Sequence, residues 1–296
     1  MRPSITLVLG VIFSILDSGR CDLPLNLTNA TGGKAIKEGT KLRVLCAGDS
    51  ITSGWMSSDG NGYRLKLQED LSEDDLVFAG ELTTGNMTDG YFAAWPGKTI
   101  QYISDHIGPS LDQQPNIILL HAGTNDMDDR PERSIEGNDP VKTAKRLGDL
   151  VDQMIEACPD AVILVAVIIG TCDPHKATTT PEYQALIPGI VEERRAANHS
   201  VLAVDFSVFP EEDLQDCIHP TDTGYRMLGD YWYDYMTQIP TDWIKEPTGD
   251  DPERGDDDVK SGAKKTEIED SVGNMTRVPW LALFCSGAIA LFRILL

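Results

Sequence analysis

The chain has 296 residues, of which 41% are hydrophobic, and a formal net charge of −22. This length suits one domain of about 200 residues with processed or flexible ends, or two smaller domains. The apolar share is ordinary for a globular protein and sufficient for a sizeable core. The excess of negative charge argues against nucleic acid as a partner and disfavours polyanionic substrates, because such a surface repels both.

Residues 1–20 have the features of a secretory signal peptide. Arg2 gives a short positive start, and the apolar stretch from Ile5 to Leu16 is too short to span a bilayer. Asn-x-Ser/Thr sequons follow this segment, so N-glycosylation is expected. The sequons start at Asn26, Asn29, Asn86, Asn198 and Asn274.

The cysteines are spread along the chain, at Cys21, Cys46, Cys158, Cys172, Cys217 and Cys285. They form no CxxC pair and no metal-ligand spacing, so we expect no metal site, and no cofactor is implied. In the oxidising compartment that a signal peptide indicates, some of them should form disulfides.

From Lys41 to about Trp243, after a loose lead-in at residues 22–40, short apolar runs alternate with helical patterns. Strands are expected at Leu42–Ala47, Leu76–Gly80, Ile117–His121, Val162–Ile169 and Val201–Phe206. Helices are expected at Tyr63–Leu71, Thr99–Ile107, Val141–Ala157, Pro181–Ala197 and Thr221–Met236. Short, almost continuously apolar runs are typical of parallel strands covered on both faces. The alternation therefore predicts one α/β domain, at residues 41–243, with a doubly wound sheet.

The composition changes after Trp243. Residues 244–277 are rich in charged residues, Gly and Ser, which predicts a disordered acidic stalk. In the apolar tail at 278–296, the apolar run Val278–Phe292 has 15 residues, fewer than the roughly 20 that a spanning helix needs. A polar spacer and the small residues Ser261 to Ala263 precede it, which is the order of a glycosylphosphatidylinositol (GPI) anchor signal. A single-pass membrane helix is the alternative.

Polar segments follow three of the expected strands. Ser50 ends the first, Asn125 follows the third, and the pair Asp216 and His219 follows the fifth. Taken singly, each has an ordinary explanation as a helix cap, a turn or a surface pair. Because the carboxyl ends of parallel strands meet at one sheet edge, however, these segments should share a crevice. They would then supply a nucleophile, an oxyanion donor and a base with its orienting carboxylate.

Three sequence blocks carry a family resemblance. GDSIT at 48–52, GTND at 123–126 and DCIHP at 216–220 resemble the blocks of SGNH (GDSL-type) hydrolases, and the resemblance spans roughly Lys41 to Met236. It implies a flavodoxin-like sandwich with a five-stranded parallel sheet in the order 2-1-3-4-5.

The resemblance also implies the role of each site residue. Ser50 attacks the acyl carbon, His219 takes its proton, and Asp216 orients His219. The oxyanion is held by the Ser50 N–H, the Gly97 N–H and the Asn125 side chain. Gly97 lies just before an expected helix and is the better match to the family's glycine, with Gly90 as the alternative.

Longer stretches narrow the resemblance further. Residues 50–55, 58–64, 121–127 and 219–225 are similar to acetylxylan esterases of carbohydrate-esterase family three. This implies removal of O-acetyl groups from a polysaccharide such as xylan. The alternatives are an esterase or lipase for longer acyl chains, and a non-catalytic carbohydrate-binding surface protein. Trp55 and Trp95 lie in loops near catalytic positions and could stack on sugar rings. The acidic loop 126–129 is expected to be solvated, with a contact to a ligand or a cation as the alternative.

A disulfide between Cys172 and Cys217 follows from the implied strand order. Cys172 lies after the fourth strand, Cys217 lies between the catalytic Asp and His, and both loops should emerge at the same edge. Such a bridge would brace the turn that carries the base and contribute about 4 kcal/mol. We expect Cys46, inside a strand, and Cys158, at a helix end, to be buried and free.

Overall fold

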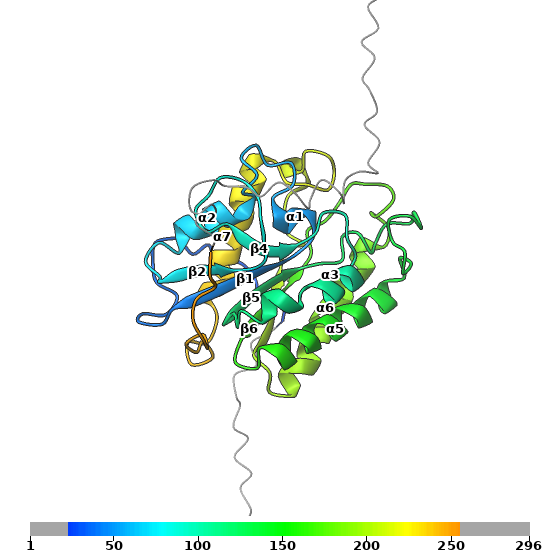
Figure 1. Ribbon diagram of the computed structural model, residues 1–296. Helices are drawn as coiled ribbons and strands as arrows, with labels where there is room; N and C mark the ends of the chain where they lie inside the picture. Colours follow the sequence, from blue (N-terminus) through cyan, green and yellow to red (C-terminus); the bar gives the residue numbers. More distant parts are fainter. Residues whose placement is uncertain (1–22, 255–296) are drawn as a thin grey trace, which may run out of the picture.

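The computed structural model describes residues 23–254 (Figure 1). The segment predicted as a signal peptide, the apolar tail at 278–296 and the Asn274 sequon all lie outside the described residues. Among residues 23–254, no helix has both the length and the hydropathy needed to cross a membrane.

The described chain forms three layers, with helices on both faces of a central sheet (Figure 1). The strands are β1 (Leu42–Gly48), β2 (Leu76–Ala79), β3 (Leu82–Thr83), β4 (Tyr91–Ala94), β5 (Ile117–His121), β6 (Val162–Val167) and β7 (Val201–Asp205). The α-helices are α1 (Ser50–Ser53), α2 (Tyr63–Asp70), α3 (Ile100–His106), α4 (Gly108–Leu111), α5 (Pro140–Ala157), α6 (Thr180–Ala196) and α7 (Asp222–Thr237), and Glu211–Asp213 forms a 3-10 turn. The predicted α/β class is confirmed.

Strands β2, β1, β5, β6 and β7 are parallel neighbours in that order, which is the expected 2-1-3-4-5 arrangement. Two further strands were not expected. β4 pairs in parallel with the last two residues of β1, Ala47 and Gly48, and β3 pairs antiparallel with β4. β3 has two residues and β4 has four, and both are recognised by their pairing in the sheet.

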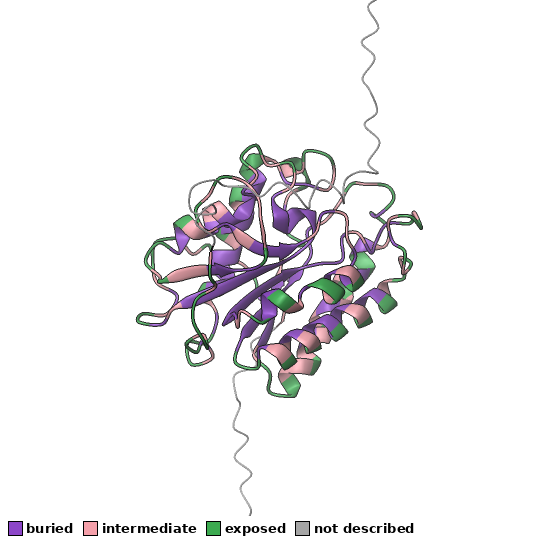
Figure 2. Ribbon diagram, viewed as in Figure 1, coloured by how far each residue is buried: buried purple, intermediate pink, exposed green. Residues whose placement is uncertain are grey.

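Each face of the sheet has its own hydrophobic core. Successive residues of β1 point alternately to the two sides, so Val44 joins the core under α2 and α7 while Leu45 joins the core under α3, α5 and α6. All seven residues of β1 are buried, and the buried colour covers the central strands in Figure 2. The near-continuous apolarity of this run is therefore explained by burial on both faces.

The folded part begins before the predicted boundary at Lys41. Leu25 forms a parallel bridge with Val204 in β7. The buried carboxylate of Asp234 on α7 accepts hydrogen bonds from the backbone N–H groups of Thr28 (2.6 Å) and Asn29 (2.9 Å). The lead-in is thus attached to the domain rather than loose.

The folded part also extends beyond Trp243. Residues 244–254, predicted as the start of the stalk, instead lie against the sheet. The guanidinium of Arg43, whose side chain is 2% exposed, pairs with Asp251 at 3.0 Å and donates to the carbonyl of Thr248 at 2.8 Å. A buried guanidinium needs acceptors, and this polar segment provides them. Composition alone therefore placed the end of the domain too early.

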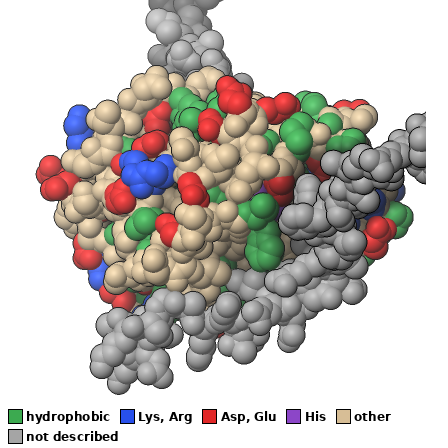
Figure 3. Space-filling view, turned by 90° about the horizontal axis from the view of Figure 1, so that it is seen from above, with side chains coloured by type: hydrophobic (Ala, Val, Ile, Leu, Met, Phe, Trp, Pro, Cys, Tyr) green, Lys and Arg blue, Asp and Glu red, His purple; other side chains and the backbone are tan. Residues whose placement is uncertain are grey.

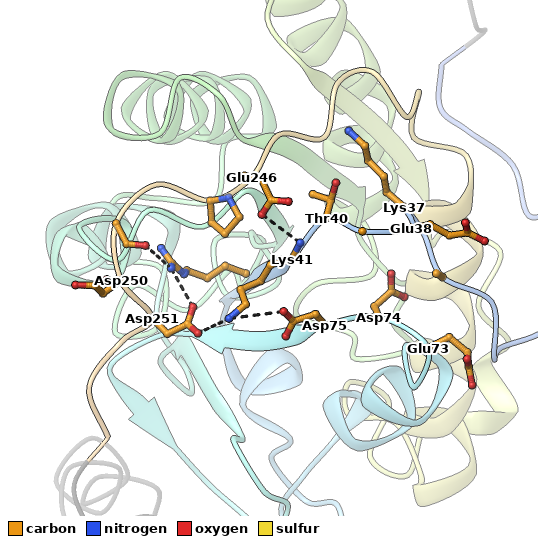
Figure 4. Close-up of a pocket in the computed structure, with 15 residues that line it drawn as sticks. Lys37, Glu38, Thr40, Lys41, Glu73, Asp74, Asp75, Glu246, Asp250 and Asp251 are labelled. Atoms are coloured by element: carbon orange, nitrogen blue, oxygen red, sulfur yellow. Dashed lines mark hydrogen bonds and ion pairs between the residues drawn. The ribbon is translucent and has the colours of Figure 1, made fainter.

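A cavity of about 600 Å³ lies at the amino ends of β1 and β2. Its lining mixes basic and acidic side chains, and Lys41 pairs there with Asp251 (2.5 Å) and Asp75 (3.8 Å) (Figure 4). Ser50 follows the opposite, carboxyl end of β1. The cavity is therefore separate from the site described next.

Candidate active site

Ser50 is held at the carboxyl end of β1, as the first residue of α1. A Cβ at Gly48 would lie 2.2 Å from the backbone oxygen of His121 on the adjacent strand, so only glycine permits this close strand pairing. Asp49 caps α1, because its carboxylate accepts the N–H of Ile51 at 3.1 Å. The side chain of Ser50 therefore starts from a rigid strand end.

His219 lies between Ser50 and Asp216. Its Nε2 is 2.8 Å from Ser50 Oγ, and its Nδ1 is 2.8 Å from Asp216 Oδ2. The second oxygen of Asp216 accepts the backbone N–H groups of His219 (2.7 Å) and Ile218 (3.1 Å). Burial alone would raise the pKa of Asp216, but these hydrogen bonds outweigh it and leave the pKa below its ordinary value. The anionic carboxylate favours a proton on Nδ1, which leaves Nε2 free to accept the serine proton.

The turn that carries these residues is cross-linked. Cys217 forms a disulfide with Cys172, with 4.7 Å between their Cα atoms, as predicted. The carbonyl of Cys217 accepts the Thr171 hydroxyl at 2.6 Å. Cys46 and Cys158 are buried and free, also as predicted. The catalytic turn is thus attached both covalently and by hydrogen bonding to the loop after β6.

The unexpected strand β4 decides between the two candidate glycines. Its carboxyl end pairs with Gly48, so the turn containing Gly97 begins beside the segment that carries Ser50. Gly97 has φ +74°, in the left-handed region that favours glycine. Gly90 precedes β4 at its other end, where its carbonyl accepts Arg64 Nη1 at 2.7 Å. The geometry favours Gly97.

The amide of Asn125 reaches both neighbouring segments. Its Nδ2 donates to the carbonyl of Lys98 at 3.0 Å and to Asp49 Oδ2 at 3.3 Å. Burial raises the pKa of Asp49 to about 6, although the N–H of Ile51 acts in the opposite direction. Asn125 therefore lies between the residue that precedes Ser50 and the residue that follows Gly97, where the resemblance places an oxyanion donor.

With this geometry established, the comparison with known families is decisive. Residues 46–227 match the model of the GDSL-like lipase/acylhydrolase family. The protein belongs to this family.

Solved structures agree with membership of the GDSL-like family. A Clostridium thermocellum family 3 carbohydrate esterase superposes with a TM-score of 0.58 and 25% identity, covering 67% of this chain and 96% of that one. A family 3 carbohydrate esterase from Talaromyces cellulolyticus superposes with a TM-score of 0.56 and 20% identity over 67% and 97% of the two chains, which supports the fold alone.

The chain also matches parts of two curated relatives. A multidomain esterase of Ruminococcus flavefaciens is 23% identical over 228 residues, which cover 66% of this chain and 28% of the relative. A protein of Acetivibrio thermocellus that is named as an endoglucanase is 27% identical over 146 residues, covering 48% of this chain and 59% of the relative. The chain therefore spans less than two thirds of the length of either protein.

The acidic loop of this GDSL-like domain was wrongly expected to be solvated, because two of its three aspartates are buried. Asp126, 0% exposed, accepts the N–H of Ile100 (2.9 Å) and pairs with Arg146 on α5 (3.0 Å). It therefore ties the start of α3, just after Gly97, to the loop of Asn125. Burial raises the pKa of Asp126 to about 6, against the hydrogen bond from Ile100.

Asp128 is the second buried aspartate of this loop, at 1% exposure. It forms ion pairs with Lys176, which is also buried, and with Arg130 at 2.6 Å. Burial alone would raise the pKa of Asp128, but these cations hold it well below its ordinary value. Among residues 23–254, no group of three or more acidic, His or Cys residues is arranged to hold a metal ion.

The two tryptophans considered for sugar stacking have different surroundings. Trp95 packs against the core beneath α3, with its ring 6.0 Å from that of Tyr102 and 5.9 Å from that of His106. Trp55 belongs to neither hydrophobic core. Its backbone is fixed, because its N–H donates to Ser50 at 2.9 Å and its carbonyl accepts the Tyr225 hydroxyl at 2.6 Å.

Proposed function

We propose that this protein hydrolyses carboxylic esters, with Ser50 as the nucleophile. The observation that carries the proposal is the continuous hydrogen-bonded chain from Ser50 through His219 to Asp216, at 2.8 Å for each link. His219 would take the Ser50 proton during attack on the acyl carbon and then protonate the leaving alcohol. Asp216, already ionised and hydrogen-bonded, would orient the ring and stabilise the imidazolium.

The charge that develops on the acyl oxygen needs donors in place before the reaction. The backbone N–H groups of Ser50 and Gly97 and the amide of Asn125 would supply them. Asn125 donates to Asp49 over the longer of its two bonds, 3.3 Å, so this is the bond that an oxyanion would replace. Losing one such donor costs about 3–4 kcal/mol in the transition state.

As substrate we propose an O-acetylated, uncharged polysaccharide such as acetylated xylan. Similarity to the family 3 carbohydrate esterase of Clostridium thermocellum supports this choice. So does the charge, because seen from the top of Figure 1 the surface carries many Asp and Glu side chains and few Lys or Arg (Figure 3). Such a surface would repel a polyanion but not a neutral sugar chain. A longer acyl group is the second candidate, since the family also includes lipases by its description.

Acetate release separates these substrates. The enzyme should release acetate from acetylated xylan faster than from acetylated chitin or mannan, and should prefer acetyl over longer chains in a series of p-nitrophenyl esters. A fluorophosphonate probe should label Ser50, and S50A is the matched control. If the probe leaves Ser50 unlabelled, the proposal is wrong, and a non-catalytic carbohydrate-binding protein becomes the alternative to test.

We further propose that the enzyme is secreted, glycosylated and attached to the cell surface by a GPI anchor. The signal-like residues 1–20 and the apolar tail support the first and last points. The asparagines of the four sequons within residues 23–254 are all exposed, namely Asn26, Asn29, Asn86 and Asn198. Phosphatidylinositol-specific phospholipase C should release the protein from membranes. Protein that stays bound and still carries residues 278–296 by mass spectrometry would instead be held by a membrane helix.

A further inference from the structure

We propose that Trp55 and Met56 form the subsite for the alcohol part of the ester, and that this alcohol is a sugar residue. The inference rests on the proposed ester hydrolysis at Ser50. His219 Nε2 must protonate the leaving alcohol oxygen, so this oxygen must come within hydrogen-bond reach of Nε2. The carbonyl oxygen of the ester would instead point toward Gly97 and Asn125, the proposed oxyanion donors. The alcohol therefore lies on the His219 side of Ser50.

The segment at Trp55 and Met56 is fixed to that side. Gln215, in the catalytic turn, donates through its side chain to the carbonyls of Met56 (3.1 Å) and Pro220 (2.8 Å), and its backbone N–H donates to His219 (2.9 Å). Trp55 is tied to Ser50 through its backbone N–H. The two residues thus stay in a constant position relative to both the nucleophile and the base.

The side chain of Trp55 is available to a ligand. Trp95 and Trp243 pack against the hydrophobic cores, and Trp232 is buried within one. Trp55 is half-buried, packs against neither core, and makes no ring contact or indole hydrogen bond within residues 23–254. Its ring offers an apolar surface and its indole N–H a hydrogen-bond donor. A sugar can use both, because its C–H face can stack on the ring while a hydroxyl accepts the N–H.

Met56 has an unusual backbone conformation for a residue with a side chain. Its φ of +68° lies in the left-handed region, and the residue is 46% exposed. This conformation is costly for any residue other than glycine, Asn or Asp, and such outliers concentrate at functional sites. The bond from Gln215 holds it in place. A flexible, polarisable thioether beside an indole can adapt to the uneven face of a sugar ring.

The test compares two acetate esters that differ only in the alcohol. Acetylated xylo-oligosaccharide presents a sugar, whereas the alcohol of ethyl acetate is too small to cover an indole ring. In W55A, the ratio of kcat/KM for the sugar ester to that for ethyl acetate should fall about tenfold, which corresponds to about 1.4 kcal/mol. W55F, which keeps a ring but loses the N–H, should give a smaller decrease.

Trp243→Phe is the matched control, because Trp243 is also half-buried but packs on the core, and the ratio should not change. Fluorophosphonate labelling of Ser50 verifies that each variant is folded and has an intact triad. An unchanged ratio in both W55A and W55F would overturn the subsite. A wild-type enzyme that cleaves ethyl acetate but not the sugar ester would overturn the sugar assignment and leave ester hydrolysis standing. A wild-type enzyme that cleaves neither, with Ser50 unlabelled, would overturn the proposed function as well.

Discussion

The two ends of the parallel sheet both hold charged side chains, but they use them differently. At the amino end, Arg43 donates to the carbonyls of Gln113, Thr248 and Gly249 and pairs with Asp251. These contacts within the fold use most of the donors of its guanidinium. At the carboxyl end, Asp216 holds one nitrogen of His219 and leaves the other for Ser50. One end thus uses charge to close the fold, and the other end keeps a reactive atom available. Variants at the two ends should separate stability from activity.

The largest effect is expected at the carboxyl end. S50A or H219A should each lower kcat by about a millionfold, and the double variant should be little worse because triad members act as a unit. D216N should lose less, about ten thousandfold. The melting temperature should change little, since no core contact is lost. Kinetics with p-nitrophenyl acetate and calorimetry measure both quantities, and residual activity above a tenth in S50A would contradict the mechanism.

The disulfide connects stability to activity at the same end. Replacing Cys172 and Cys217 with alanine should lower the free energy of unfolding by about 4 kcal/mol and kcat/KM by about tenfold or more, because the turn carrying His219 is no longer braced. Cys158→Ala is the control, since its thiol is free. Its activity should match that of the wild type. Equal loss of activity in both proteins would show that the bridge does not position the base.

The amino end should show the reverse pattern. A chain that ends at Trp243 should lose about 3 kcal/mol of unfolding free energy, because buried Arg43 loses Asp251 and two carbonyl acceptors. A chain that ends at Arg254 should be as stable as the full chain. The kcat of folded molecules should be the same in both. Urea unfolding distinguishes the two shortened chains. Equal unfolding midpoints would show that the folded domain ends at Trp243.

The smallest effect concerns Asp126. Its pKa in the folded protein is raised to about 6 from an ordinary 3.8, so the folded state holds the proton more tightly than the unfolded state does. Stability from this group is therefore lost as pH rises from about 4 to about 6. In D126N this loss disappears, so the variant should gain about 2 kcal/mol relative to the wild type between these pH values. Urea unfolding at pH 4 and pH 7 measures the difference, and a pH-independent difference would exclude Asp126 as its source.

The triad and the sheet could be predicted because their signals are local. Ser50, Asp216 and His219 stand in short motifs at the ends of apolar runs, and parallel topology brings those ends together. The rest depends on contacts between distant residues. Arg146 lies 20 positions from Asp126, and Lys176 lies 48 positions from Asp128, so no spacing pattern reveals that the acidic loop is buried. β4 has four residues and is defined by its pairing with β1. This pairing cannot be read from the sequence of those four residues.

The placement of β1 has a consequence for how the protein opens in solution. This strand pairs with β2, β4 and β5, so its amides are protected on both edges. Hydrogen exchange there should require global unfolding, whereas loops with fewer partners exchange through small local openings. Exposed loops elsewhere on the domain can therefore open locally while the backbone beneath Ser50 stays closed. Ser50 therefore lies just after β1, the strand that should open last.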